Sequence, residues 1–349
     1  MKLPYDPKLD TRKLSQIFNN TSASYKFYWF LGILDEIEKD KCEIIKTELF
    51  TKMISIPWYT VNYFKLSFGS QDKIHQSAKR IQEILNIPVS YSKHRIEELI
   101  LKNQDEEINR LIWHFNKNVP YKFLSPWMGA LSEKEIMNKS ESELINTLYI
   151  LRDDRILVRE EWANYLKRNI RFMRDFTYWN LLHFIQRRNP GTPDIADKII
   201  KPAKRESLTK YRNSYWNIYL DQHHSTRCIF TGEVLDGDDY DLDHFIPHSF
   251  MPANQIWNLV PISSSFNSSK SNKVPNLNIY FENFFQLQKD AYSFLEKKLN
   301  HSKFKNFKEE FLYIYPELYS SNDFEFKRYK ETIEPLCNVA LNNGFQILN

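Results

Sequence analysis

The chain has 349 residues, of which 42% are hydrophobic and 15% aromatic, so it can bury a sizeable core and wholesale disorder is excluded. Only seven glycines occur, and the single close pair, Gly232 and Gly237, is followed by an aspartate rather than a lysine. The common glycine-rich nucleotide-binding motifs are therefore excluded. The scarcity of glycine favours a mostly helical protein, and the net charge of +4 is by itself too small to indicate a nucleic-acid partner.

The cysteines and the N-terminus indicate the cellular compartment. Three widely spaced cysteines (Cys42, Cys228 and Cys337) suit a reducing environment rather than a disulfide framework. The first ten residues lack the apolar core of a signal peptide. The longest apolar run, 27–34, is far shorter than the roughly 20 residues that cross a bilayer. We expect a cytoplasmic protein that does not contact a membrane.

Residues 1–190 are predicted to form a helical domain that recognises a partner or target. The first helix carries Tyr25, Trp29, Ile33 and Ile37 at helical spacing. Two interpretations of the many aromatic side chains stay open, a base-stacking surface and a helix-packing core, and the packing core is favoured. Further amphipathic helical stretches are expected near 71–86, 94–118, 134–151 and 155–188.

A Pro-Gly-Thr-Pro break at 190–193 begins a predicted basic linker or docking segment, 191–222. Between residues 167 and 212, twelve basic residues stand against four acidic ones, a local excess of +8. Such a stretch is either a solvated helix face or a surface that docks a phosphate backbone, and its position before the segment described next favours docking. The predicted phosphate contacts are Arg187, Arg188, Lys204 and Arg205.

Residues 228–275 carry the pattern of a strand, a loop, a second strand and a short helix. Alternating residues predict a strand at 239–244 that ends before Pro247, and a second strand at 256–261. Serines at 263–265 can cap a short helix, which must stop before Pro275. This order brings the end of the first strand beside the helix.

Three side chains of this unit have the chemistry that phosphodiester hydrolysis needs. The Asp243 carboxylate and the Asn267 amide oxygen are ligands suited to Mg²⁺. The His244 imidazole can take a proton from an attacking water near neutral pH. Hydrolysis requires such a base for the nucleophile and a cation for the developing negative charge.

Ordered matches connect the segment with a known family. They are Asp-Leu-Asp-His at 241–244, Pro-His-Ser-Phe at 247–250 and Asn-Ser-Ser-Lys-Ser-Asn-Lys-Val-Pro at 267–275. In these stretches the chain resembles the HNH endonucleases, and within them most of all the HNH nuclease domain of RNA-guided type II CRISPR effectors. The resemblance implies a ββα-metal fold of the H-N-N variant and a product that carries a 5′-phosphate.

The resemblance assigns roles to single positions. His244 would be the general base, and Asp243 and Asn267 would hold one divalent metal, Mg²⁺ or Mn²⁺ as its substitute. Asn258 would fix the loop between the strands and orient the base. Asp241 would support the metal ligands, or else be a simple carboxylate on the strand surface.

Lys270 and His248 are predicted phosphate contacts, although either could be merely exposed. His223 and His224 precede Cys228 and could suggest a metal site, but without a second ligand pair they are taken as surface or packing residues. Many family members brace this unit with zinc bound by two Cys-x-x-Cys pairs. The corresponding places here are Cys228, Thr231, Ser263 and Phe266, so we expect no structural zinc and bracing by the flanking helices instead.

The prediction as a whole is a mainly α protein with helical N- and C-terminal regions around a small ββα-metal nuclease unit. Its parts are 1–190, the linker 191–222, the nuclease unit 223–278 and a C-terminal helical region 279–349. We expect a metal-dependent endonuclease that cleaves nucleic acid, above all DNA, in bacterial restriction or phage defence. The alternatives are an effector nuclease activated by a protein partner through the helical regions, and a nucleic-acid-binding adaptor with little catalysis.

Overall fold

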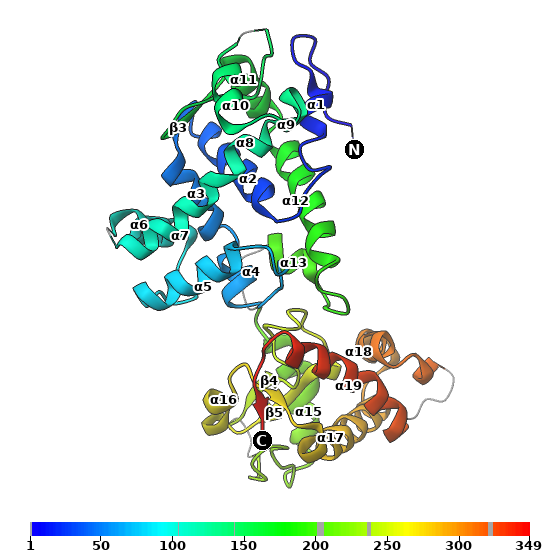
Figure 1. Ribbon diagram of the computed structural model, residues 1–349. Coiled ribbons are helices and arrows are strands. Elements are labelled where there is room, and N and C mark those ends of the chain that lie inside the picture. Colours follow the sequence, from blue (N-terminus) through cyan, green and yellow to red (C-terminus); the bar gives the residue numbers. More distant parts are fainter. Residues whose placement is uncertain (1, 104, 143, 201–205, 236–238, 320–323) are drawn as a thin grey trace. The chain divides into compact units, whose positions relative to one another are not determined.

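The computed structural model describes residues 2–103, 105–142, 144–200, 206–235, 239–319 and 324–349. The fold is mainly α, as predicted, with a few short strands (Figure 1). The chain divides into two compact units, residues 1–190 with 198–202 and residues 191–197 with 203–349. No helix in the described ranges combines the length and apolar character that a membrane span requires.

The N-terminal unit is built around helix α2 (Tyr25–Ile37), which packs against α3, α8, α11 and α12. The rings of Trp29 and Trp162 are fully buried, and this favours the packing interpretation of the aromatic residues; Trp179 is an exception, with 52% of its surface exposed. The other helices are α1 (Thr11–Ser15), α3 (Lys46–Ser55), α4 (Trp58–Asn62), α5 (Ile74–Leu85), α6 (Lys93–Lys102), α7 (Glu106–Trp113), η1 (His114–Lys117), α8 (Val119–Phe123), α9 (Ser125–Met128), α10 (Glu133–Ser140), α11 (Glu160–Arg168) and α12 (Ile170–Gln186).

A small antiparallel sheet in this unit was not predicted. It consists of β1 (Glu43–Ile45), β2 (Tyr149–Leu151) and β3 (Arg155–Val158) in the order β1–β3–β2. The expectation of helix up to residue 151 and from residue 155 is therefore wrong at these positions. In β3 the side chains alternate between buried and half-buried, a two-residue period that a search for helical periodicity does not register.

The C-terminal unit combines the predicted nuclease unit with the helices that follow it. Its elements are α14 (Thr209–Tyr211), the π-helical turn η2 (Arg212–Trp216), α15 (Asn217–Leu220), β4 (Asp241–His244), η3 (Ile256–Asn258), β5 (Leu259–Ile262), α16 (Ser264–Lys270), β6 (Val274–Pro275), α17 (Leu277–Lys298), α18 (His301–Ile314), η4 (Pro316–Tyr319), α19 (Phe326–Asn342) and β7 (Ile347–Leu348). Helix α13 (Ile195–Ile200) crosses the division between the units.

One hydrophobic core runs through the whole C-terminal unit. Leu259 of β5, Phe284 of α17, Phe311 of α18 and Ile333 of α19 are all fully buried members of it. Helices α15, α18 and α19 pack on α17, and α16 packs on β4 (Figure 1). The last strand, β7, pairs in parallel with β6 directly after the nuclease segment. The predicted unit 223–278 therefore shares its core with the predicted region 279–349.

The ββα order itself is as predicted, with shifted boundaries. Strand β4 begins two residues later than expected, at Asp241. The second strand spans 259–262, because residues 256–258 form a 3-10 turn instead. Helix α16 follows Ser263, although the side chain of this residue makes no capping hydrogen bond.

Candidate active site

The site is built on the antiparallel pair β4 and β5. Asp243 lies opposite Val260, and His244, the last residue of β4, lies opposite Leu259. Pairing continues one step further, since the Phe245 amide donates to the Asn258 carbonyl at 2.7 Å. The end of β4 is therefore held on the partner strand just where the predicted base stands.

Asn258 clamps the backbone that follows His244. Its Oδ1 accepts a hydrogen bond from the Ile246 amide at 2.8 Å, and its Nδ2 donates to the Ile246 carbonyl at 3.0 Å. The side chain is fully buried, so water does not compete for these two bonds. The two bonds fix the backbone of Ile246 and do not contact the imidazole ring of His244.

His244 is buried, with 3% of its surface exposed. Its Nε2 lies 2.9 Å from Oδ1 of Asn254, and the ring of His248 packs edge-on against it at 5.1 Å between centroids. Burial, followed by the neighbouring His248, lowers the pKa of His244 to about 4, against a smaller opposing effect of Asp243. The imidazole is therefore neutral at pH 7 and able to accept a proton.

Helix α16 places two side chains against β4. Asn267 Nδ2 donates to Asp241 Oδ2 at 2.9 Å. One helical turn later, Lys270 Nζ donates to Asp243 Oδ2 at 2.7 Å and to the His244 carbonyl at 2.6 Å. Residues three apart share a helix face and residues two apart share a strand face, so Asn267 and Lys270 reach Asp241 and Asp243 from one face of α16.

Two expectations about exposure are corrected by these contacts. Lys270 has no exposed surface and His248 has 5%, so neither is the merely exposed residue that the sequence allowed for. Asp241 is hydrogen-bonded to Asn267 rather than standing alone on the strand surface. Whether Lys270 and His248 contact phosphate stays a prediction.

The donor atoms at this place fit a hard divalent cation. Because Asn267 gives its Nδ2 to Asp241, its amide oxygen is the atom left for a ligand, and Asp243 keeps the carboxylate oxygen that Lys270 does not use. Carboxylate and amide oxygens are the donors that Mg²⁺ accepts. Within the described residues no group of three or more His, Cys, Asp or Glu side chains could hold a metal, so any ion here depends on the asparagine and on water.

Helices outside the ββα motif brace the site. Gln288 of α17 is fully buried, and its Nε2 lies within hydrogen-bonding distance of the carbonyls of Ile256, Trp257 and Leu259, the shortest contact being 3.0 Å to Leu259. Glu310 of α18 accepts from the Ile256 amide at 2.6 Å. These contacts hold the stretch that leads into β5.

Aromatic packing joins the two segments that carry zinc ligands in many HNH proteins. Phe230, between the places of the first pair, stacks on Phe266 at 5.5 Å and on Phe245 at 6.2 Å. Cys228 is buried. His223 stacks on Tyr219 at 4.3 Å, in agreement with its interpretation as a packing residue.

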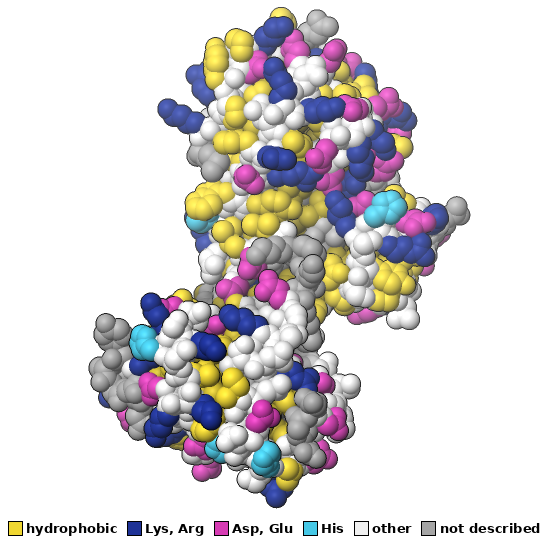
Figure 2. All heavy atoms as spheres, turned by 180° about the vertical axis from the view of Figure 1, so that it is seen from behind, with side chains coloured by type: hydrophobic (Ala, Val, Ile, Leu, Met, Phe, Trp, Pro, Cys, Tyr) yellow, Lys and Arg dark blue, Asp and Glu magenta, His cyan; other side chains and the backbone are white. Residues whose placement is uncertain are grey.

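The described part of the basic stretch is partly neutralised by acidic residues from other elements. Lys167 pairs with Asp40, and Arg174 pairs with Asp35 and Glu38. On the face of the N-terminal unit seen in Figure 2, basic and acidic side chains are intermixed. The excess counted along the sequence therefore overstates the charge of the folded surface.

The four predicted phosphate contacts of this stretch have different surroundings. Arg188 donates to the carbonyls of Phe184 and Ser22 and lies 3.5 Å over the Phe184 ring, within the N-terminal unit. Arg187 is exposed. Lys204 and Arg205 lie outside the described residues.

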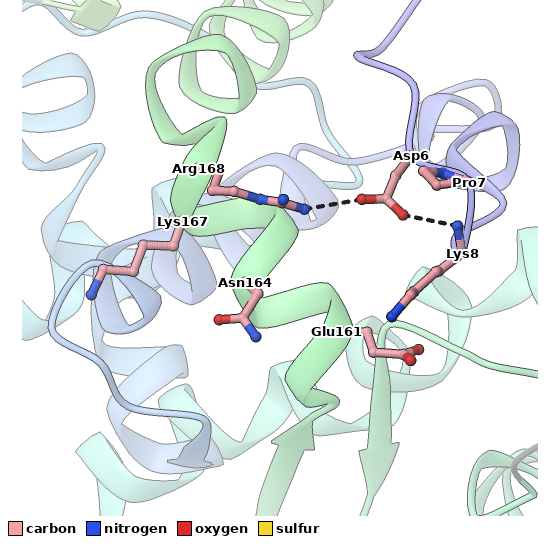
Figure 3. A pocket seen from close by; sticks show the side chains of 7 residues that line it. All are labelled: Asp6, Pro7, Lys8, Glu161, Asn164, Lys167 and Arg168. Atoms are coloured by element: carbon pink, nitrogen blue, oxygen red, sulfur yellow. Dashed lines mark hydrogen bonds and ion pairs between the residues drawn. The ribbon is translucent and has the colours of Figure 1, made fainter.

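A hollow in the N-terminal unit gathers charged residues (Figure 3). Asp6 accepts hydrogen bonds from Arg168 and from the Lys8 amide, and Glu161 lines the same hollow. Arg168 and Asp6 form an ion pair across it, and Lys167 pairs with Asp40, which favours a structural role for these charges.

The comparison with protein families decides the identity of the segment. Residues 228–276 match the model of the HNH endonuclease family. These residues form an HNH endonuclease domain. The match contains every residue of the site described above except Gln288 and Glu310, which reach the HNH domain from α17 and α18.

Two curated relatives match part of the chain. The CRISPR-associated endonuclease Cas9 of Listeria innocua is 34% identical over 116 residues, which cover 30% of this chain and 8% of that protein. The CRISPR-associated endonuclease Cas9 of Streptococcus mutans is 40% identical over 101 residues, 27% of this chain and 7% of that protein. The chain thus spans less than a tenth of either relative. No solved structure matches it.

Sequence reasoning did not find Asn254, Gln288 or Glu310 as parts of the site. Gln288 and Glu310 lie outside the motif, and a buried glutamine or glutamate in a helix has no pattern that tells it from an exposed one. Asn254 lies in an irregular loop, where spacing predicts no contact. Only the fold reveals that it reaches His244.

Proposed function

We propose that the protein is a divalent-metal-dependent endonuclease that hydrolyses DNA through its HNH domain. The observation that supports this proposal is the packing of α16 on β4, which sets Asn267 against Asp241 and Lys270 against Asp243, next in the chain to the buried His244. A base and a set of hard oxygen donors are the two parts that hydrolysis of a phosphodiester requires.

The residues act as follows. His244 accepts a proton from water, whose oxygen attacks the phosphorus while the bond to the 3′ oxygen breaks and a 5′-phosphate remains. Asp243 and Asn267 would hold Mg²⁺, or Mn²⁺ in its place, which supplies positive charge for the phosphate and the leaving oxygen. Asp241 keeps the Asn267 amide turned so that its oxygen is available. Asn258 fixes the backbone at the end of β4.

Phosphate contact by Lys270 and His248 is part of the proposal. The Lys270 ammonium group donates to Asp243 and to the His244 carbonyl. A phosphate that it binds would be a further acceptor beside these two. The basic residues Arg187, Arg188, Lys204 and Arg205 are proposed to dock the phosphate backbone without reading sequence. The division into 1–190, 191–222, 223–278 and 279–349 is proposed as a division by function, in which 223–278 and 279–349 share one hydrophobic core.

A role in bacterial restriction or phage defence is proposed from the architecture and from the two relatives, which are CRISPR-associated endonucleases of bacteria. The helical N-terminal unit would then recognise the target or a partner.

The experiment is cleavage of supercoiled plasmid by the full chain with Mg²⁺ or Mn²⁺. We expect cleavage that EDTA abolishes and that falls by at least about 100-fold in His244→Ala, because general-base catalysis is lost. His224→Ala, a change at an exposed histidine, is the matched control and keeps full activity. Equal rates for wild type and His244→Ala contradict the proposal, and cleavage that requires an added partner protein supports the partner-activated alternative.

A further inference from the structure

A loop residue contacts the ring of the proposed base directly. Asn254 Oδ1 lies 2.9 Å from His244 Nε2. A carboxamide oxygen has no hydrogen to donate, so the hydrogen of this bond belongs to Nε2. A neutral imidazole carries a single ring hydrogen, and the other nitrogen, Nδ1, therefore keeps its lone pair.

The loop is itself held by two helices of the C-terminal unit. The hydroxyl of Tyr211, in α14, lies 2.7 Å from the Asn254 carbonyl and 3.1 Å from Glu310 Oε1, so it shares its hydrogen between two acceptors. The other oxygen of Glu310 accepts from the Ile256 amide at 2.6 Å. Groups outside the ββα motif thus hold the loop at the Asn254 carbonyl and again two residues later, at the Ile256 amide.

We propose that Asn254 is the positioning residue that keeps the hydrogen of His244 on Nε2, so that Nδ1 is the atom that takes the proton from water, with Tyr211 and Glu310 holding Asn254 in place. The proposal rests on the proposed function, which makes His244 the base. It gives Asn254 a role distinct from that of Asn258, whose bonds reach the Ile246 backbone.

The proton balance follows from this arrangement. One O–H bond of water breaks and an Nδ1–H bond forms, which leaves His244 as an imidazolium with hydrogens on both nitrogens. The Nε2–H group still donates to Asn254 Oδ1, now as a charge-assisted bond, which is stronger than the neutral one. Asn254 therefore binds the charged form of the base more tightly than the neutral form.

The first test compares two replacements at position 254 in the plasmid assay. Asn254→Leu removes the acceptor at similar volume, and we expect kcat to fall by about 100-fold with KM unchanged. Asn254→Asp keeps an acceptor oxygen, and we expect kcat within about 10-fold of wild type. Asn306→Leu, at an exposed asparagine of α18, is the control for the same chemical change.

Tyr211→Phe tests the outer part of the network. We expect a smaller loss of kcat than in Asn254→Leu, and no additional loss when both changes are combined, because the two residues act through one contact. Losses that add independently contradict the proposed link between Tyr211 and Asn254.

The second measurement is independent of cleavage. In the full chain labelled with ¹⁵N-histidine, the His244 signals are assigned by their loss in His244→Ala. We expect the hydrogen on Nε2 in wild type and Asn254→Asp, and a mixture of both forms in Asn254→Leu. A hydrogen on Nδ1 in wild type, or wild-type kcat in Asn254→Leu, overturns the proposal. A wild-type chain that shows the Nε2–H form without cleaving any plasmid instead contradicts the proposed function alone.

Discussion

The N-terminal unit and the HNH domain both bury ionisable side chains, but they use them differently. In the N-terminal unit, Lys52 lies 3.1 Å from Glu36 and 3.1 Å from Glu97, and all three are largely buried. In the HNH domain, Lys270 lies 2.7 Å from Asp243. Beside that pair, Nδ1 of His244 and the amide oxygen of Asn267 have no hydrogen-bond partner among the described residues.

The difference separates a structural cluster from a reactive one. Buried charges that pair with one another, as in Lys52 with Glu36 and Glu97, contribute to stability and have few hydrogen-bonding positions left for a ligand. Acceptors that stay unused next to a matched pair can take a proton or a cation, as active sites require. The comparison therefore predicts that disturbing the first cluster changes stability alone, whereas disturbing the second changes stability and cleavage together.

The largest effect is expected when Lys270 is replaced by methionine. The change leaves the buried Asp243 carboxylate without its ammonium partner, which costs about 4 kcal/mol in the free energy of unfolding. Chemical denaturation, monitored on the transition of the C-terminal unit, measures the loss. Cleavage should fall as well, since the same change removes the bond to the His244 carbonyl.

A control variant and a double variant test whether the loss comes from the ion pair. Lys273→Met changes a more exposed lysine just beyond α16, and we expect less than about 1 kcal/mol. The double variant Lys270→Met with Asp243→Asn removes both charges, and much of the stability should return while cleavage stays low. A Lys270→Met protein as stable as wild type would show that the pair is not the buried contact described above.

How far the sequence determined the fold is visible in the HNH domain. The order strand, strand, helix followed from turn residues and alternation, and the motif positions His244, Asp243 and Asn267 lie on β4 and on the helix that packs against it. The bounds of β5 were missed because the apolar Ile256 and Trp257, which belong to a 3-10 turn, have the residue types expected at the start of a strand. Local patterns predict which elements form more reliably than where each one begins.

The parts that escaped prediction depend on contacts between distant segments. The Glu310 carboxylate and the Ile256 amide are 54 positions apart, and no periodicity relates them. The basic excess at 167–212 is partly neutralised by Asp40, Asp35 and Glu38, which pair with its lysine and arginine side chains. These carboxylates are more than 100 positions away in the sequence. The sequence gives the number of charged residues in a stretch, whereas the fold determines which of them form ion pairs.

The matched cluster of the N-terminal unit predicts a pH dependence of stability. Burial alone would raise the pKa of Glu36, but hydrogen bonds from Lys39 and Lys52 lower it to about 2, below its usual 4.5. A folded-state pKa below the unfolded one gives stability that is complete above pH 4.5 and is lost as the pH falls toward 2. The full contribution is about 3 kcal/mol.

Urea denaturation of wild type and Glu36→Gln at several pH values measures this contribution. The stability difference between them should be largest at pH 7 and should shrink as the pH falls through 4.5 toward 2. Glu98→Gln is the matched control, because Lys102 and Arg95 also lower the pKa of Glu98, to about 2, but at the surface, where solvent screens the charges. A difference that does not change with pH would mean that Glu36 contributes through packing rather than charge.

The smallest of the three effects concerns the aromatic stack of the HNH domain. Phe266 is half-buried against Phe230, and Phe266→Ala removes this contact between the two segments that zinc joins in many HNH proteins. Full burial would make such a change cost 3 kcal/mol or more, so about 2 kcal/mol is expected here. Phe266→Leu, which keeps apolar volume, should cost less than half as much. If this packing replaces the zinc, a chelator selective for zinc over Mg²⁺, such as 1,10-phenanthroline, should leave the unfolding midpoint of wild type in Mg²⁺ unchanged, and a midpoint lowered by that chelator would contradict this account of the bracing.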